Sequence, residues 1–414
     1  MCKNLSCKCS GDEKEMTEVV IIGSGPAASS LARVLAKEGK EVLMVEKRKQ
    51  VGVPVRCGEG LGEREVAAQN ITIPKEVYST EIKGARVVSP EGTDIIWKDE
   101  ETKGWVLERK MFDQWLNELA IDEGAKTLVW TRASDLIKKD GKISGIKVTH
   151  KEEEEYEIEA PMVVSAEGME ALIARKAGFD TVHKPYDVDT CYQYEMKPYD
   201  HQNLIELYFG NKIAPRGYVW IFPKANRKAN VGLGVGGTVL NGEKLGGMKG
   251  CDPKILMDEF IKNHDQLKDS STLNEFGGVI SVGAPLDKFT TDNFMVIGTA
   301  AKQVDPIHGG GIALAMESGL MAAEVILKAK GDYSDNVLKE YDSVWKSKLG
   351  KKVAKRLMLR KVMEKLNDDD LNYIFKAITD KELNKVMKGD FAGPVAKVLT
   401  GRPQLLKILG ALVP

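Results

Sequence analysis

The chain has 414 residues, of which 43% are hydrophobic and 29% are charged, and its formal net charge is −1. This balance is typical of a globular protein of two or three domains and lacks the positive charge that would favour nucleic acid as a partner. No run approaches the ~18 apolar residues of a membrane-spanning helix, and residues 1–16 are too polar for a signal peptide. We therefore expect a cytoplasmic protein.

The cysteines are too sparse for a disulfide framework in a chain of this length. Three of them, Cys2, Cys7 and Cys9, lie close together at the start. Three thiolates leave a tetrahedral metal site one ligand short. We therefore predict no metal site and expect a reduced terminal tail.

The first regular pattern is "EVVIIGSGPAASSLARVLAKEGKEVLMVEK". It predicts a strand of β-branched residues, a glycine turn, an amphipathic helix to Gly39 and a second strand ending at Glu46. Gly23, Gly25 and Ala28 match the dinucleotide-binding pattern, and Glu46 lies where an acid binds ribose hydroxyls. Such glycines let the backbone approach a pyrophosphate at a helix N-terminus. The segment therefore predicts a site for FAD or NAD.

The next segments extend this α/β pattern. A helix is predicted from about Lys110 to Glu123, between two strands. Three short alternating segments follow over residues 134–160, and Asp140-Gly141 is a strong turn signal between the first two. A meander inserted between pieces of a dinucleotide domain suggests a flavoprotein rather than a simple dehydrogenase.

Residues 186–284 change to strands of period two, including "CYQYEM", "LIELYFG" and "GYVWIFPK", and predict a second, mostly β domain. The segment "NFMVIGTAAKQVDPIHGGGIALAMESGL" then restores the α/β pattern as a strand, a glycine-rich loop and a long helix. The remaining residues, from 331 onward, are helical in pattern and rich in lysine.

Several motifs together define a resemblance: "GSGPAA" with Glu46, "GVPVRCGEG", "ERKMFDQWL", "VVSAEG", "YVWIFPK" followed by "GLG", and "GTAAKQVDPIHGGGI". In these motifs the chain resembles the FAD-dependent geranylgeranyl reductases, within the wider fold group of para-hydroxybenzoate hydroxylase, over most of residues 17–330. The aromatic motif is the most specific of the set. The chain differs from the wider group where Glu167-Gly168 replaces Asp-Gly and Gly298-Thr299 replaces Gly-Asp.

The resemblance implies an α/β fold with a Rossmann-like FAD-binding domain that carries the inserted β-meander, a mostly β substrate domain for a prenyl chain and a C-terminal helical region. The expected boundaries are 17–80, 104–185 and 285–330 for the FAD-binding domain, 81–103 and 186–284 for the substrate domain, and 331–414 for the helical region.

The expected cofactor is FAD. Three glycines before a helix, at 309–311, suit the negative charge of a reduced flavin, because a helix N-terminus offers free N–H groups. Arg109 resembles an arginine that faces the flavin or its phosphates, and a surface ion pair is the alternative. The full set of expected FAD residues is Gly23, Gly25, Pro26, Ala27, Ala28, Glu46, Lys47, Arg56, Cys57, Gly58, Arg109, Glu167, Gly168, Gly298, Thr299, Pro306, Gly309, Gly310, Gly311 and Ile312.

In "RGYVWIFPK", strand alternation places Tyr218, Trp220 and Phe222 on one face. Flat side chains in a row suit a long hydrocarbon, and Tyr192 on a neighbouring segment adds to the set. The alternative is that these rings are ordinary core. The expected substrate residues are Tyr192, Tyr218, Trp220, Phe222, Pro223, Gly232, Gly234 and His308.

Hydride addition to an isolated prenyl double bond also needs a proton donor near the flavin. Cys57 and Glu59 are the candidate catalytic residues in the loop "GVPVRCGEG". A thiol is a weak acid toward an alkene, so Cys57 is also a candidate for shaping the pocket. Glu59 is the stronger acid and would stay protonated if burial dominated. A structural turn is the alternative for both.

The resemblance therefore implies a reductase that saturates geranylgeranyl chains of archaeal-type ether lipid precursors. Two other hypotheses stay open: a flavin-dependent aromatic or quinone monooxygenase, and a non-catalytic prenyl-lipid carrier. The sequence has no second dinucleotide fingerprint, so the electron donor is expected to be ferredoxin or a transiently bound NAD(P)H.

Residues 346–365, "KSKLGKKVAKRLMLRKVMEK", predict a basic amphipathic helix with Leu349, Val353 and Leu357 at helical spacing. Such a helix can lie on an anionic membrane, which would give the enzyme access to a lipid substrate. The alternative is a solvated helix packed on the flavin domain. We expect peripheral association with the membrane.

Overall fold

The dinucleotide motif forms the predicted βαβ unit. Strand β2 (Val19–Ile22), helix α1 (Pro26–Lys37) and strand β3 (Val42–Val45) follow one another, and both strands are fully buried and pair in parallel. Continuous apolar strands of this kind belong to a sheet that is covered on both faces. The computed structural model describes residues 15–236, 252–379, 382, 385 and 392–403. The Cys2, Cys7 and Cys9 tail lies outside these residues.

A six-stranded sheet surrounds this unit in the order β19-β20-β13-β2-β3-β9. Its other strands are β9 (Lys126–Leu128), β13 (Met162–Ser165), β19 (Thr290–Thr291) and β20 (Phe294–Val296). Helix α1 packs against both α3 (Arg109–Asp122) and α6 (Ile312–Ala329). The predicted helix from about Lys110 to Glu123 is therefore confirmed to within one residue. A Cβ at Gly319 of α6 would lie 2.4 Å from the Ala27 carbonyl oxygen, so glycine permits the close approach of α1 and α6.

The predicted meander is also present. Strands β10 (Thr131–Lys139), β11 (Lys142–His150) and β12 (Glu154–Glu159) pair antiparallel, and the short β1 (Glu15–Met16) joins β12 in parallel. Asp140 and Gly141 both have positive φ angles, 49° and 78°. This is the backbone that a tight hairpin turn requires, which explains the Asp-Gly signal.

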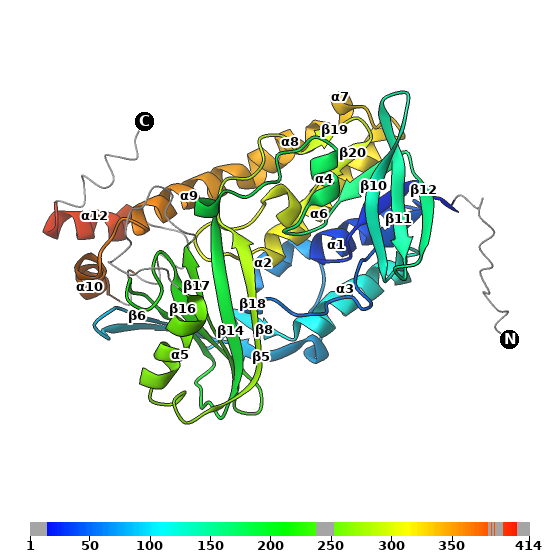
Figure 1. Cartoon of the computed structure of the whole chain (residues 1–414). Helices are drawn as coiled ribbons and strands as arrows, with labels where there is room; N and C mark the ends of the chain where they lie inside the picture. Colours follow the sequence, from blue (N-terminus) through cyan, green and yellow to red (C-terminus); the bar gives the residue numbers. More distant parts are fainter. Residues whose placement is uncertain (1–14, 237–251, 380–381, 383–384, 386–391, 404–414) are drawn as a thin grey trace.

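A seven-stranded sheet forms the second layer, below the C-terminal helices in Figure 1, in the order β18-β14-β17-β16-β15-β6-β7. Its strands are β6 (Gly84–Val88), β7 (Asp94–Lys98), β14 (Val188–Lys197), β15 (Leu204–Tyr208), β16 (Tyr218–Lys224), β17 (Lys228–Gly236) and β18 (Ser271–Ser281). Helix α5 (Pro253–Asn263) covers one face. A separate small sheet has three strands, in the order β4 (Gly60–Gly62), β8 (Gly104–Leu107) and β5 (Tyr78–Ile82). Two short helices, α2 (Glu63–Val66) and α4 (Leu172–Lys176), lie in connecting segments.

The helices after residue 330 run from the six-stranded sheet across the seven-stranded sheet (Figure 1). They are α7 (Asp335–Leu338), α8 (Glu340–Trp345), a π-helical turn (Lys346–Gly350), α9 (Lys351–Met363), α10 (Asp368–Ala377) and α12 (Ala392–Gly401). Tyr341 and Trp345 anchor this region in the core of the six-stranded sheet. The domain boundaries stay a prediction.

Helix α9 is not a uniformly solvated basic helix. Arg360 is 6% exposed, and its Nη2 lies 2.7 Å from an Asp189 carboxylate oxygen. Arg360 also pairs with Glu364, which pairs in turn with Arg216 at 2.9 Å. Carboxylates from distant segments therefore draw part of the basic sequence into the interior.

Candidate active site

The first glycine loop has the geometry of a dinucleotide site. Gly23 has φ +106°, and a Cβ there would lie 2.5 Å from the Ala166 carbonyl oxygen, so a side chain does not fit. Gly25 begins α1 without a side-chain cap, and a Cβ built on it meets no atom within 4 Å. The Glu46 carboxylate faces this loop, since its Oε2 accepts from the backbone N–H and the hydroxyl of Ser24 at 3.3 and 3.1 Å.

The second glycine loop, at 309–311, leads into helix α6, whose N-terminus lies near that of α1. Gly311 precedes α6, again without a side-chain cap. A Cβ at Gly298 would lie 3.0 Å from Cβ of Ala27 in the first turn of α1 and 3.6 Å from Cβ of Ala315 in the first turn of α6. Gly298 and the adjoining Thr299 therefore lie between the two helix N-termini.

These residues suit FAD. Two helices of 12 and 18 residues present uncapped N-termini beside glycines, and such ends bind phosphate and stabilise negative charge. The α1 end with Gly23, Gly25 and Glu46 would hold the pyrophosphate and a ribose. The α6 end with Gly309–Gly311 would face the flavin ring.

Two of the expected cofactor residues are engaged elsewhere. Both carboxylate oxygens of Glu167 accept hydrogen bonds at the start of α4, from Ile173 N–H and Ala174 N–H at 3.0 Å each. Glu167 therefore fixes the chain beside Gly23 by capping α4. Its carboxylate is occupied by these hydrogen bonds, and its contact with the cofactor stays a prediction. Lys47 forms an ion pair with Glu170 at 2.5 Å.

Arg109 forms an ion pair, as the alternative reading expected, but the pair is not on the surface. Its Nε and Nη2 bind both carboxylate oxygens of Asp113, at 3.0 and 2.8 Å, and its side chain is 16% exposed. Burial lowers the pKa of Arg109, but the Asp113 carboxylate and the adjacent Cys57 thiol outweigh this and raise it. A permanent cation therefore lies beside Cys57.

The aromatic residues of β16 share one face, as strand alternation predicts. Cross-strand pairing sets Tyr218 opposite Gly234 and Trp220 opposite Gly232. A Cβ at Gly232 would lie 2.3 Å from the Trp220 ring, so only glycine leaves room for the indole. Val219 occupies the other face and is fully buried.

The loop that carries Cys57 lies directly on these rings. Cβ atoms at Gly58 and Gly60 would lie 3.2 and 3.0 Å from the Phe222 ring, and Trp220 is only 6% exposed. The rings therefore do not form an open wall along their whole length. Trp220 supports the Cys57 loop here, and its contact with a lipid chain stays a prediction.

Two expected substrate residues point away from this face. Tyr192 pairs with Leu233, which is opposite Val219, so its ring lies on the side of α5, where Lys254 is 5.3 Å from its centroid. Pro223 follows the same alternation and points away from the rings. The expectation that Tyr192 joins the aromatic row is therefore wrong. His308 does lie near the row, because its carbonyl oxygen accepts from the Tyr218 hydroxyl at 2.7 Å.

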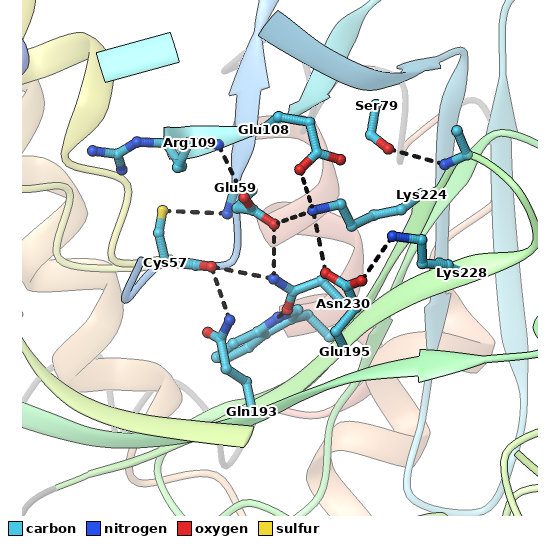
Figure 2. A network of polar contacts seen from close by, with 12 residues as sticks. Cys57, Glu59, Ser79, Glu108, Arg109, Gln193, Glu195, Lys224, Lys228 and Asn230 are labelled. Atoms are coloured by element: carbon cyan, nitrogen blue, oxygen red, sulfur yellow. Dashed lines mark hydrogen bonds and ion pairs between the residues drawn. The ribbon is translucent and has the colours of Figure 1, made fainter. Parts of the chain in front are cut away.

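Glu59 is buried within a network of donors (Figure 2). Its Oε1 accepts from the backbone N–H of Arg109 at 3.0 Å, at the start of α3. Its Oε2 accepts from Lys224 Nζ at 2.9 Å and from Asn230 Nδ2 at 3.3 Å. A carboxylate that meets only donors acts as an acceptor. These contacts make Glu59 a residue that holds the loop to α3, β16 and β17, and its catalytic role stays a prediction.

Three residues of this network were missed from the sequence: Gln193, Lys224 and Asn230. Gln193 Nε2 and Asn230 Nδ2 donate to the Cys57 carbonyl at 2.9 and 3.2 Å, and Trp220 Nε1 donates to Asn230 Oδ1 at 3.0 Å. Strand alternation alone puts Lys224 on the face of Trp220, and this signal was available in "YVWIFPK". The positions of Gln193 and Asn230 on this face follow only from the register between β14, β16 and β17.

Comparison with known proteins agrees with this geometry. Residues 16–206 match the FAD binding domain family, and residues 187–280 match the geranylgeranyl reductase catalytic domain. The fold and site therefore define an FAD-dependent oxidoreductase. Digeranylgeranylglycerophospholipid reductase 2 of Methanococcoides burtonii is 38% identical over 375 residues, which cover 89% of each chain. The chain belongs to the digeranylgeranylglycerophospholipid reductase family.

Solved structures support the same assignment. A geranylgeranyl bacteriochlorophyll reductase-like protein of Thermoplasma acidophilum superposes with a TM-score of 0.86 at 32% identity, covering 97% of this chain and 100% of that one. A flavin-dependent brominase variant superposes with a TM-score of 0.68 at 17% identity, covering 96% and 98%, and shares the fold alone. The predicted family, the reductase class and the FAD cofactor are confirmed.

Proposed function

We propose that this chain saturates the carbon–carbon double bonds of geranylgeranyl chains in archaeal-type membrane lipid precursors. The observation that carries the proposal is the Cys57 loop, which rests on the aromatic row of β16 within the matched catalytic domain. When bound, FAD supplies the hydride. The relatives named digeranylgeranylglycerophospholipid reductase support this substrate class.

Within the loop, we assign the catalytic role to Cys57 rather than to Glu59. Cys57 packs with the apolar cluster that contains Ile312 and Ala313, in the first turn of α6. This cluster joins the Cys57 loop to the helix whose N-terminus would face the flavin ring, which favours Cys57 as the residue that meets the reacting double bond. Glu59 is instead engaged by three donors, the Arg109 N–H, the Lys224 ammonium and the Asn230 amide, which suits it to fixing the loop.

The test is anaerobic single turnover. The protein is reduced chemically and mixed with a geranylgeranyl ether phospholipid, and flavin absorbance and lipid mass are followed together. We expect flavin reoxidation without oxygen and a product that gains two hydrogen atoms per double bond. Reoxidation that requires oxygen would support a monooxygenase, and lipid binding without reoxidation would support a carrier. Acid treatment should release FAD, since we expect the cofactor to be bound non-covalently.

Peripheral membrane association is the second part of the proposal. Lys351, Lys352 and Lys355 of α9 are exposed, and so is Met358, which is 51% accessible. Arg356 does not add to this surface, because its guanidinium pairs with Asp305. None of the helices in the described part of the chain is both long and apolar enough to cross a bilayer. The exposed lysines favour docking on an anionic bilayer surface.

Liposome co-sedimentation tests this surface. Each lysine near an anionic surface contributes about 1 kcal/mol, so changing Lys351, Lys352 and Lys355 to Gln should weaken binding roughly 100-fold at low salt. A matched control changes the exposed Lys126, Lys138 and Lys142 of the other end of the molecule to Gln. Equal losses in both triple variants would remove α9 as the docking surface.

The electron donor is proposed to be ferredoxin or a transiently bound NAD(P)H. In the portion of the chain that the structure describes, β2, α1 and β3 form the βαβ unit with the dinucleotide glycine pattern. We assign that unit to FAD, so the donor needs a different, transient contact. Flavin reduction rates with each donor under anaerobic conditions distinguish the two.

A further inference from the structure

The conformation of the Cys57 loop depends on contacts from outside the loop. Glu59 has φ +73° although it carries a side chain, and glycines 58 and 60 flank it. Left-handed backbone is unusual for such a residue and persists where the surroundings hold it. Within the loop, the Glu59 N–H donates to Cys57 Sγ at 3.2 Å, so the position of Glu59 and that of the thiol are linked.

The first outside contact is an ammonium group. Lys224 Nζ is buried, with its side chain 2% exposed, and it lies 2.9 Å from Glu59 and 3.0 Å from Glu108. Burial lowers the pKa of Lys224, but the carboxylates of Glu59 and Glu108 outweigh it and raise the pKa. Lys224 therefore stays charged, and from the end of β16 it holds the Glu59 side chain in place.

The second outside contact is an amide group. Asn230 Nδ2 reaches both the Cys57 carbonyl, at 3.2 Å, and Glu59 Oε2, at 3.3 Å. Its Oδ1 accepts from the Trp220 indole N–H at 3.0 Å, which fixes the direction of the amide. Asn230 therefore joins the loop to the aromatic row through a single side chain (Figure 2).

We propose that Lys224 and Asn230 are positioning residues that hold the Cys57 thiol beside Arg109, an inference that rests on the proposed function. Stability alone does not call for them, because a buried ion pair whose two partners are replaced together by apolar residues often loses no stability. Apolar side chains fill the opposite face of the same strands. A buried charge and an amide on this face instead specify one loop geometry.

The test compares Lys224→Met, Lys224→Arg and Asn230→Leu, with Lys138→Met as a control at an exposed site. Anaerobic turnover gives kcat and KM, and flavin absorbance gives bound FAD. The rate of alkylation of Cys57 by iodoacetamide, resolved by peptide mass spectrometry, reports changes in the access and surroundings of the thiol without any turnover. Cys191 is the internal reference, because burial raises the pKa of its thiol to about 12 and unfolding would expose it.

We expect Lys224→Met and Asn230→Leu to lower kcat about 10-fold to 100-fold, as expected for lost hydrogen bonds to a buried charge. FAD content, KM and Cys191 alkylation should stay near wild type, while the Cys57 alkylation rate changes. Lys224→Arg should recover most of kcat. Wild-type kcat and Cys57 reactivity in both Met and Leu variants would overturn the proposal. Loss of FAD with faster alkylation at both cysteines would also overturn it, since that outcome marks a purely structural role.

Failure of the proposed function gives a different pattern. If wild type reduces no prenyl lipid, the alkylation rates still decide whether Lys224 and Asn230 position Cys57. Unchanged Cys57 alkylation in the variants would then overturn the positioning role by itself.

Discussion

The two faces of strands β16 and β17 both carry buried side chains, but these side chains differ in chemistry. On the α5 side, Val219, Ile221 and Leu233 are fully buried in an apolar cluster. On the other side, Lys224 and Asn230 are 2% and 3% exposed, yet they carry a charge and an amide. The exposed fraction of a side chain alone therefore does not distinguish a core residue from a residue of the site. The functional side is recognised by buried polar groups that are all engaged in one network.

The difference also predicts how each face responds to substitution. An apolar cluster resists loss of volume and tolerates swaps of similar volume. A polar network depends on the direction of each donor, and loss of one partner leaves others unsatisfied. Substitutions on the α5 side should therefore change stability alone, and those on the other side should change the reaction as well.

The largest expected effect is on the apolar face. Leu233→Ala should lower the free energy of unfolding by about 2–5 kcal/mol, because it leaves a cavity at a residue that is 0% exposed. Denaturant unfolding measures this change, and Leu233→Met is the control of similar volume. kcat and the Cys57 alkylation rate should stay near wild type in the folded fraction. A lower kcat at unchanged stability would mean that the α5 side takes part in the reaction.

An intermediate effect is expected from Trp220→Phe, which keeps a ring but removes the N–H that donates to Asn230. One hydrogen bond contributes about 1 kcal/mol, so kcat should fall about fivefold, and Cys57 alkylation should change. Tyr218→Phe is the matched control, because it also removes one donor, but that donor binds the His308 carbonyl instead of the network. Equal changes in Cys57 reactivity in both variants would contradict the comparison.

The smallest effect is expected on stability when the pH is lowered, through His264 at the end of α5. Burial lowers the pKa of His264, Glu206 opposes this, and Arg86 adds to it. Because the unfolded chain binds this proton more readily, stability is fully present above the unfolded pKa, about 6.5, and is lost as pH falls through the folded pKa. The loss is at most about 1.4 kcal/mol per unit of pKa difference.

Unfolding free energies at pH 7.5 and 5.5 test this, and His264→Gln should flatten the dependence. His183, whose pKa burial also lowers, gives a second contribution that His264→Gln leaves in place. An identical pH dependence in wild type and His264→Gln would exclude His264 as a source.

Much of the fold was readable from local signals. The glycines of the βαβ unit, the Asp140-Gly141 turn and the alternation of Tyr218 and Trp220 all depend on neighbours in sequence, and the structure agrees with each. Tyr192 was misplaced because the face of a strand relative to its neighbour depends on register, which single-strand alternation does not give.

The site was less readable for the same reason. Glu59 was identified, but its partners Lys224 and Asn230 are 165 and 171 residues away, and its hydrogen bonds depend on them. Glu167 stays a predicted cofactor residue, and its hydrogen bonds at the start of α4 were not readable from its motif. Residue type indicates what a group can do, and long-range contacts decide which of these roles it has.

The ion pair between Arg360 and Asp189 limits how this sequence can be recombined with its relatives. The two residues are 171 positions apart, and removing one partner of a buried pair costs about 3–5 kcal/mol. A hybrid gene with a junction between them would combine an arginine from one parent with whatever the other parent has at the facing position. Viable chimeras should therefore inherit both halves of this pair, and of the pair between Arg356 and Asp305, from the same parent.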